Sequence, residues 1–189
     1  MADSTPTLVK GLAGIPCAES TVAFIDGQIG KLQYRGYRIE ELAANCSFED
    51  VSFLLLNDRI GTAEEIKAFD AELKSKRTLE PALLQMIALM PESGHPMDVL
   101  QSITAAMALY YPCKDVADAS IQGAAVTRVI ASVPTIIAAF DRSRRGLQPV
   151  APRSDLSHAA NFLYMLTGEE ANPVAVKTMD TALVLHAEH

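Results

Sequence analysis

The sequence predicts an all-α chain with one small β-hairpin near its N-terminus. From residue 39 onward, apolar residues recur at spacings of three and four, which is the period of a helix buried along one face. Residues that favour the start of a helix, namely Ser, Thr, Asn and Pro, precede most of these runs. β-Branched and aromatic residues gather around glycine turns only between residues 21 and 37. No internal repeat or linker divides the chain, so we expect one continuous helical body.

The predicted hairpin lies in STVAFIDGQIGKLQYRGY, where two strand-like runs flank the Asp-Gly pair at 26–27. A short helix is expected to follow and to end at Asn45. Ser47 and Asp50 then have the three-residue spacing of a capping box, in which each side chain bonds the other residue's backbone N–H. They predict a helix over SFEDVSFLLLNDR.

Capping signals also mark the next three helices. Thr62 followed by Glu65 is a second capping box. Pro81 and Pro96 stand before apolar periodic runs, in the position where the missing N–H of proline costs a helix nothing. These two prolines predict helices over PALLQMIALM and PMDVLQSITAAMALYY.

The longest predicted helix runs from about Ala119 to Arg145 and has hardly any polar face. A helix that is apolar nearly all round is expected to be buried in a large core or against a second subunit. Pro134 lies inside it, so we expect a kink near residue 132 or 133.

Two further helices complete the chain. Ser154 or Asp155 is expected to cap LSHAANFLYMLTG, which Gly168 would end. Asn172 and Pro173 would begin the last helix as N-cap and first residue. That helix has no Gly, Asn or Pro to stop it, and its final residues still follow the helical period. We therefore expect a chain that has been cut within a longer helix.

Composition argues against several classes of function. With 16 Lys and Arg against 23 Asp and Glu, the net charge is −7, so no nucleic-acid partner is expected. The cysteines Cys17, Cys46 and Cys113 form no CxxC pair and are expected to be free thiols in a reducing compartment. The N-terminus lacks a signal-peptide pattern, and no apolar run approaches the roughly 20 residues of a membrane span. We expect a cytoplasmic protein without a membrane partner.

The histidines are the first candidate site residues. His186 and His189 lie three positions apart near the chain's end, where neighbouring imidazoles could bind a metal. A catalytic zinc site needs a third ligand, and His95 and His158 are distant in sequence, so no metal site is expected. We interpret His186 as a core histidine that extends the apolar stripe, and His189 as the better candidate to face a ligand. Capping and local hydrogen bonding explain His95 and His158, which fall in first helical turns.

A basic cluster leaves one alternative open. Arg142, Arg144 and Arg145 close the long helix. Cations in a last turn interact favourably with the helix dipole, so a C-terminal cap is the preferred interpretation. A site for a small anion is the alternative.

Six stretches of the sequence resemble the citrate synthase family, specifically the N-terminal half of its bacterial members. They occur in family order along residues 8–189 and are GLAGIPCAEST, IDGQIGKLQYRGYRIEELA, HPMDVL, SVPTIIAAF, DLSHAANFLYMLTGEE and LHAEH. The related 2-methylcitrate synthases share most of them. The resemblance implies that residues 1–189 are the N-terminal part of the family's large helical domain, with the rest of that domain and the small domain absent.

The resemblance also implies an activity and a partner. Family members are homodimeric acyltransferases of the tricarboxylic acid cycle that condense acetyl-CoA with oxaloacetate to give citrate and CoA, without a metal or redox cofactor. Helices at about 96–111 and 119–145 would pack against the second subunit.

Site residues follow from the family's HxxHE motif, whose second histidine contacts oxaloacetate. His189 is thereby expected to bind substrate and His186 to support it. The catalytic histidines and aspartate, and the arginines that hold the carboxylates, lie further along the family's sequence. We therefore expect no catalytic residue in this chain and no activity from it alone. Two alternatives remain: a 2-methylcitrate synthase that uses propionyl-CoA, and a non-catalytic helical dimerisation scaffold.

Overall fold

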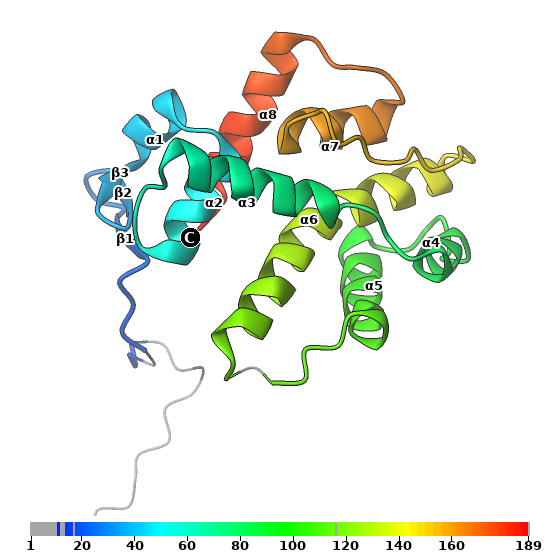
Figure 1. Cartoon of the computed structure of the whole chain (residues 1–189), viewed down its shortest axis with the longest axis horizontal. Helices are drawn as coiled ribbons and strands as arrows, with labels where there is room; N and C mark the ends of the chain where they lie inside the picture. Colours follow the sequence, from blue (N-terminus) through cyan, green and yellow to red (C-terminus); the bar gives the residue numbers. More distant parts are fainter. Residues whose placement is uncertain (1–10, 12–13, 17, 116, 189) are drawn as a thin grey trace, which may run out of the picture.

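The structure is a computed structural model that describes residues 11, 14–16, 18–115 and 117–188. Within these residues the chain is mostly helical with one small sheet, which confirms the predicted fold class (Figure 1). The elements are β1 (Ala23–Asp26), β2 (Lys31–Tyr34), β3 (Tyr37–Arg38), α1 (Ile39–Asn45), α2 (Phe48–Asn57), α3 (Ala63–Ser75), α4 (Pro81–Ala88), α5 (Pro96–Tyr110), α6 (Ala119–Arg144), α7 (His158–Thr167) and α8 (Pro173–Leu185).

The predicted hairpin forms, and a third strand extends it. β1 and β2 pair antiparallel with Ala23 opposite Tyr34, and β3 pairs antiparallel with β2. Arg35 and Gly36 join β2 to β3 with φ angles of 48° and 85°. Positive φ at both residues suits the tight turn that joins antiparallel strands, but arginine seldom adopts it. Gly36 fits this second turn, whereas Arg35 before it did not indicate one.

The Arg35 side chain ties this turn to α2. Its guanidinium donates hydrogen bonds to Thr21 Oγ1 at 3.1 Å and to the Leu55 carbonyl at 3.0 Å. It also lies 2.5 Å from the Asp58 carboxylate just after α2. These contacts offset the backbone cost of a positive φ and anchor the sheet to the helices.

Both predicted capping boxes are present. Ser47 Oγ accepts from the Asp50 backbone N–H at 3.2 Å, and Asp50 Oδ2 accepts from the Ser47 N–H at 2.8 Å. Thr62 Oγ1 accepts from the Glu65 backbone N–H at 3.3 Å, and Glu65 Oε2 accepts from the Thr62 N–H at 2.8 Å. α2 and α3 therefore begin where the sequence indicated.

The predicted start of α7 is wrong by a few residues. Ser157 caps this helix, instead of Ser154 or Asp155, and the first helical residue is His158. Asp155 forms an ion pair with Arg153 in the preceding loop. This pairing uses the carboxylate that we expected to accept the helix N–H groups.

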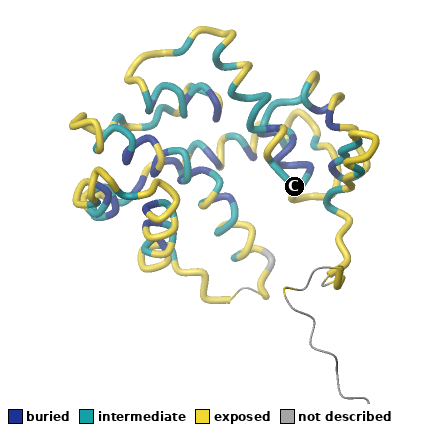
Figure 2. The backbone as a smooth tube through the Cα atoms, turned by 180° about the vertical axis from the view of Figure 1, so that it is seen from behind, coloured by how far each residue is buried: buried dark blue, intermediate teal, exposed yellow. Residues whose placement is uncertain are grey.

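The apolar core consists of three clusters, and Figure 2 shows buried residues concentrated where the helices meet. The largest joins α4, α5 and α6 and contains Leu79, Leu83, Ile87, Val99, Ile103, Met107, Ile136, Ala139 and Phe140. The second joins the sheet to α1, α2 and α8 and contains Tyr34, Ile39, Leu42, Val51, Leu54 and Val184. The third joins α2, α3 and α6 and contains Phe53, Phe69, Leu73 and Ala131.

α6 packs against α3, α4, α5 and α7 and remains one helix across Pro134. Its axis changes direction between its green and yellow halves in Figure 1, as expected for a helix with an internal proline. Val129 and Ile137 on α6 stay 41% and 37% exposed, so the chain itself does not cover every apolar side of this helix.

α6 also corrects one statement made from the sequence. Within Ser120–Arg144 an 18-residue window has a mean hydropathy of 1.6, so by length and composition the helix could cross a membrane. Of the residues in that window, 44% are buried inside the protein, and central helices of water-soluble folds pass the same test. The expectation that no apolar run approaches a membrane span is wrong, whereas the expected lack of a membrane partner stays a prediction.

Candidate functional site

The candidate site lies at the end of α8, where the sequence placed its two closing histidines. Asn172 Oδ1 caps the helix by accepting from the Ala175 N–H at 2.9 Å, as predicted. The helix ends at Leu185, and His186 is its C-cap residue. Beyond it the Ala187 N–H bonds the Val184 carbonyl at 3.3 Å, which tightens the last turn. The expectation that the helix continues to the last residues is wrong.

Tyr34 of β2 holds this turn in place. Its side chain is fully buried, and its hydroxyl lies 3.2 Å from the Leu185 carbonyl and 3.0 Å from the Glu188 carbonyl. The hydroxyl oxygen also accepts from the Glu188 N–H at 3.3 Å. Burial raises the pKa of Tyr34, so the hydroxyl keeps the proton that it donates. The hydroxyl of Tyr34 thus links the N-terminal sheet to the residues at the end of α8.

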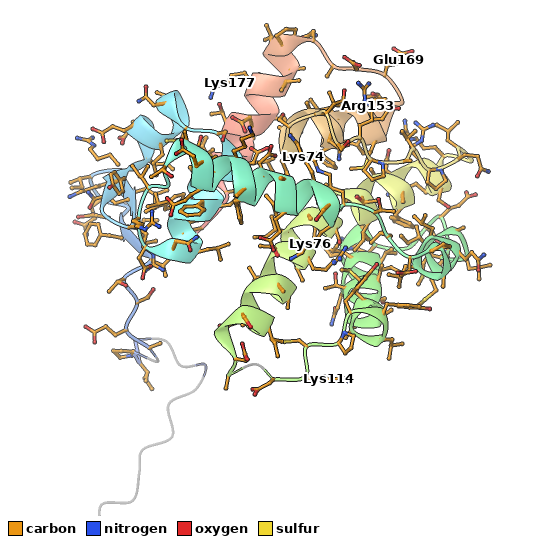
Figure 3. All side chains as sticks on the ribbon, in the orientation of Figure 1. Lys74, Lys76, Lys114, Arg153, Glu169 and Lys177 are labelled. Carbon is orange, nitrogen blue, oxygen red and sulfur yellow. The ribbon has the colours of Figure 1, made fainter. Side chains whose placement is uncertain are left out.

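α8 is further positioned by contacts with α1 and α2. Asp180 Oδ1 accepts from the Phe48 N–H at 2.9 Å, so a side chain of α8 caps α2. Lys177 Nζ lies 3.6 Å from Asp180 and 3.4 Å from the Ala43 carbonyl, and Figure 3 labels it on α8. Val184 is completely buried in the cluster with Tyr34. A rigid frame therefore presents the residues that follow the helix.

His186 is exposed, so its interpretation as a core histidine is wrong. Its Nδ1 lies 2.7 Å from the Ala182 carbonyl oxygen. A carbonyl only accepts hydrogen bonds, so Nδ1 is the donor in this contact. The ring is thereby oriented with Nε2 available to a ligand. His189, the predicted substrate-binding residue, lies outside the described residues.

The described residues contain no cluster of three or more His, Cys, Asp or Glu side chains able to hold a metal. The lack of a metal site therefore stays a prediction for the whole chain. Cys46 and Cys113 are free thiols, as expected, and Cys17 lies outside the described part of the chain. His95 caps α5 by accepting from the Met97 N–H at 3.2 Å, which confirms its structural role.

The basic cluster at the end of α6 binds backbone carbonyls. Arg142 donates to the Gln148 carbonyl at 2.6 Å and to the Leu166 carbonyl at 3.3 Å, and Arg145 reaches Leu166 at 3.0 Å. Arg145 also donates to the Asp141 carbonyl of α6 at 3.3 Å, as expected for a cap of that helix. Leu166 lies in the last turn of α7, so the same cations cap α7 and the loop as well. Arg144 lies over the Phe140 ring at 5.9 Å. The geometry favours the capping interpretation over an anion site.

Sequence reasoning missed a buried charged cluster between α2 and α7. Glu49, Arg77 and His158 are 5%, 2% and 4% exposed. Burial raises the pKa of Glu49 and lowers that of Arg77. Burial, helped by the nearby Arg77 charge, lowers the pKa of His158 to about 4, so its ring is neutral near pH 7. One sequence feature indicates that Glu49 is buried. It lies four positions before Phe53, a core residue on the same face of α2.

Comparison with known proteins now decides the family. A family model described as "Citrate synthase, C-terminal domain" matches residues 11–189. The chain belongs to the citrate synthase family. The citrate synthase of Synechocystis sp. is 45% identical over 180 residues, which cover 95% of this chain and 45% of that protein. The citrate synthase of Haloferax volcanii is 43% identical over 96% of this chain and 49% of its own length.

Two further comparisons refine the citrate synthase assignment. The 2-methylcitrate synthase of Mycobacterium tuberculosis is 37% identical, over 99% of this chain and 47% of that protein. The crystal structure of citrate synthase from Pyrobaculum aerophilum superimposes with a TM-score of 0.88 at 36% identity, over 96% of this chain and 47% of that one. This citrate synthase family chain therefore spans about half the length of the relatives that it matches. Its relatives are named as synthases, so the family consists of enzymes of that class.

Proposed function

We propose that the protein to which these residues belong is a citrate synthase, which condenses acetyl-CoA with oxaloacetate and releases citrate and CoA. The observation that carries this proposal is the 45% identity to a named citrate synthase across nearly the whole chain. The 2-methylcitrate synthase match is lower, at 37%, so acetyl-CoA is the preferred donor over propionyl-CoA. The reaction is proposed to need no metal or redox cofactor and to belong to the tricarboxylic acid cycle.

We propose that residues 1–189 are the N-terminal part of the large helical domain and contain no catalytic residue. Removing a proton from the thioester methyl group requires a positioned base and a donor that stabilises charge on the enolate oxygen. Oxaloacetate also needs several cations around its carboxylates. At the end of α8 the described residues present the exposed ring of His186, and Arg142 and Arg145 are bound to carbonyls elsewhere. The isolated chain is therefore expected to be inactive.

Two histidines are proposed to form one edge of the oxaloacetate site. His189 is the substrate-binding residue, and His186 supports it. The support for this assignment is the frame made by Tyr34, which fixes the backbone of Glu188 directly before His189. The ring of His186, oriented by the Ala182 carbonyl, is an exposed polar group three residues earlier in the sequence.

The test is a CoA-thiol release assay on the protein expressed from the complete reading frame. Acetyl-CoA with oxaloacetate should give the higher kcat/KM, and higher kcat/KM with propionyl-CoA would favour the 2-methylcitrate alternative. Absence of turnover with both thioesters would favour the non-catalytic scaffold. The 189-residue chain, assayed in parallel, should show no turnover, and activity there would refute the assignment of catalytic groups to other residues.

The partner is proposed to be a second copy that packs on α5 and α6. Support comes from large apolar side chains left in solvent on these helices: Met97 is 59% exposed, Leu109 81% and Tyr110 43%. Val129 and Ile137 extend this surface onto α6. Sedimentation should give a dimer, and Leu109→Lys should shift it toward monomer. An unchanged mass for Leu109→Lys would count against this interface.

A further inference from the structure

Tyr34 binds the backbone groups that would otherwise extend α8. In a continuing α-helix each N–H bonds the carbonyl four residues earlier, so the Glu188 N–H would bond the Val184 carbonyl. It donates instead to the Tyr34 hydroxyl oxygen at 3.3 Å. The Leu185 carbonyl, which residue 189 would bond in a longer helix, lies 3.2 Å from the same hydroxyl. A side chain of β2 thus replaces the next two bonds of the helix.

The end of α8 has no local signal that would stop the helix there. Its last turn contains no Lys or Arg, and no glycine occurs in residues 186–189. The backbone N–H groups of His186 and Ala187 bond back to the carbonyls of residues 182–184. These bonds do not involve the Leu185 carbonyl or the Glu188 N–H, which are the two groups that Tyr34 binds. The tyrosine hydroxyl therefore determines where the chain leaves the helical path.

Tyr34 is itself held in one position. Its fully buried side chain packs in the cluster that contains Val184, and Figure 1 shows α8 running toward this part of the molecule. Its backbone lies in β2, opposite Ala23 of β1. The next residue, Arg35, donates to the Leu55 carbonyl of α2 at 3.0 Å. The hydroxyl is thus fixed relative to the helices around it.

We propose that Tyr34 is a positioning residue for oxaloacetate binding, because its hydroxyl ends α8 and fixes the backbone of Glu188, to which His189 is joined. This inference rests on the proposed function, in which His189 contacts oxaloacetate. A directed hydrogen bond to a substrate weakens when the backbone that carries the donor shifts. The role needs no contact between Tyr34 and either substrate. Loss of the hydroxyl should therefore weaken oxaloacetate binding and leave the proton-transfer steps unchanged.

Tyr34→Phe in the protein expressed from the complete reading frame tests this role. Phenylalanine keeps the buried ring and removes only the hydroxyl. The KM for oxaloacetate should rise about five- to tenfold, the usual effect of losing one hydrogen bond. The KM for acetyl-CoA and kcat should stay within about twofold. An unchanged KM for oxaloacetate in a folded, active variant would overturn the proposal.

Two control variants separate positioning from stability. Tyr37→Phe makes the same chemical change at an exposed tyrosine of β3. Asn172→Ala removes the cap at the other end of α8, where Asn172 Oδ1 accepts from the Ala175 N–H. Both controls should keep the KM for oxaloacetate within about twofold. If either control raises this KM as much as Tyr34→Phe does, the effect comes from general loosening and the positioning role is wrong.

The Glu188 amide provides a measurement that needs no variant. In the unaltered protein without oxaloacetate, its hydrogen exchange, followed by mass spectrometry, should be at least about tenfold slower than in an unstructured chain. Unprotected exchange would overturn the role of Tyr34 even if Tyr34→Phe does not fold. Absence of turnover by the unaltered protein would refute the proposed function and this inference with it. An active Tyr34→Phe protein with an unchanged KM for oxaloacetate would refute this inference alone.

Discussion

Lowering the pH should destabilise the protein through His158. The folded pKa of this histidine is about 4, below the ordinary value of 6.5, because the ring is buried beside Arg77. In the interval between these values the unfolded chain binds a proton that the folded chain does not. Stability is therefore fully present above pH 6.5 and falls as the pH drops toward 4. The whole interval corresponds to about 3 kcal/mol, and the part between pH 7 and pH 5 to about 2 kcal/mol.

The assay is urea unfolding at both pH values for the original chain and for His158→Phe. Phenylalanine keeps a ring against Phe48, whose centroid lies 4.9 Å from that of His158, but it cannot titrate. The original chain should lose about 2 kcal/mol more than the variant between pH 7 and pH 5. Glu49 has a raised pKa and acts with the opposite sign, so its contribution is present at low pH and lost as the pH rises. It is present in both proteins and largely cancels in the comparison.

Ser157→Ala supplies the control, because it removes the cap of α7 without removing a titrating group. It should lower the free energy of unfolding by about 1 kcal/mol at both pH values. If the original chain and His158→Phe lose equal stability between pH 7 and pH 5, the neutral buried state assigned to His158 is wrong.

Three further substitutions test the frame around the candidate site and the core. Tyr34→Phe removes the hydroxyl that binds Glu188, so the free energy of unfolding should fall by about 1–2 kcal/mol and the amide of Glu188 should exchange faster; unchanged exchange would contradict the anchoring role. Gly168→Ala places a side chain at a φ of 88° and should cost about 1 kcal/mol in denaturant titration, whereas a neutral result would mean that the turn relaxes. Leu83→Ala opens a cavity at a completely buried position and should cost about 2–5 kcal/mol, and a loss below 1 kcal/mol would show that α4 packs differently.

Helix starts were predictable because their signals are local. The capping boxes at Ser47 and Thr62 and the first-turn prolines need only a few neighbouring residues to act. The start of α7 was missed because Arg153 from the loop takes the Asp155 carboxylate, and Ser157 became the cap. The choice between Asp155 and Ser157 as the cap is decided by a side-chain contact within the loop, which the spacing of capping residues does not reveal.

The candidate site was predictable only in part. The sequence located the site at the end of α8. We interpreted His186, however, as one more member of the apolar stripe. The helix instead stops at Leu185, and the turn that follows is held by Tyr34, more than 150 residues away in sequence. The charged cluster escaped for the same reason, because Glu49 and His158 come from segments 109 residues apart. The helical period places Glu49 on the same face as the core residue Phe53 but does not identify its distant partners.

The bond between Tyr34 and Glu188 also has a consequence for protein synthesis. The N-terminal sheet, α1 and α2 share a core with Val184, so this core stays open while the intervening helices leave the ribosome. The central cluster of α4, α5 and α6 is complete about 40 residues earlier. In nascent chains the α4–α6 core should therefore be packed before the core under the N-terminal sheet. Chaperones that shield apolar surface should accordingly bind the N-terminal sheet for longest.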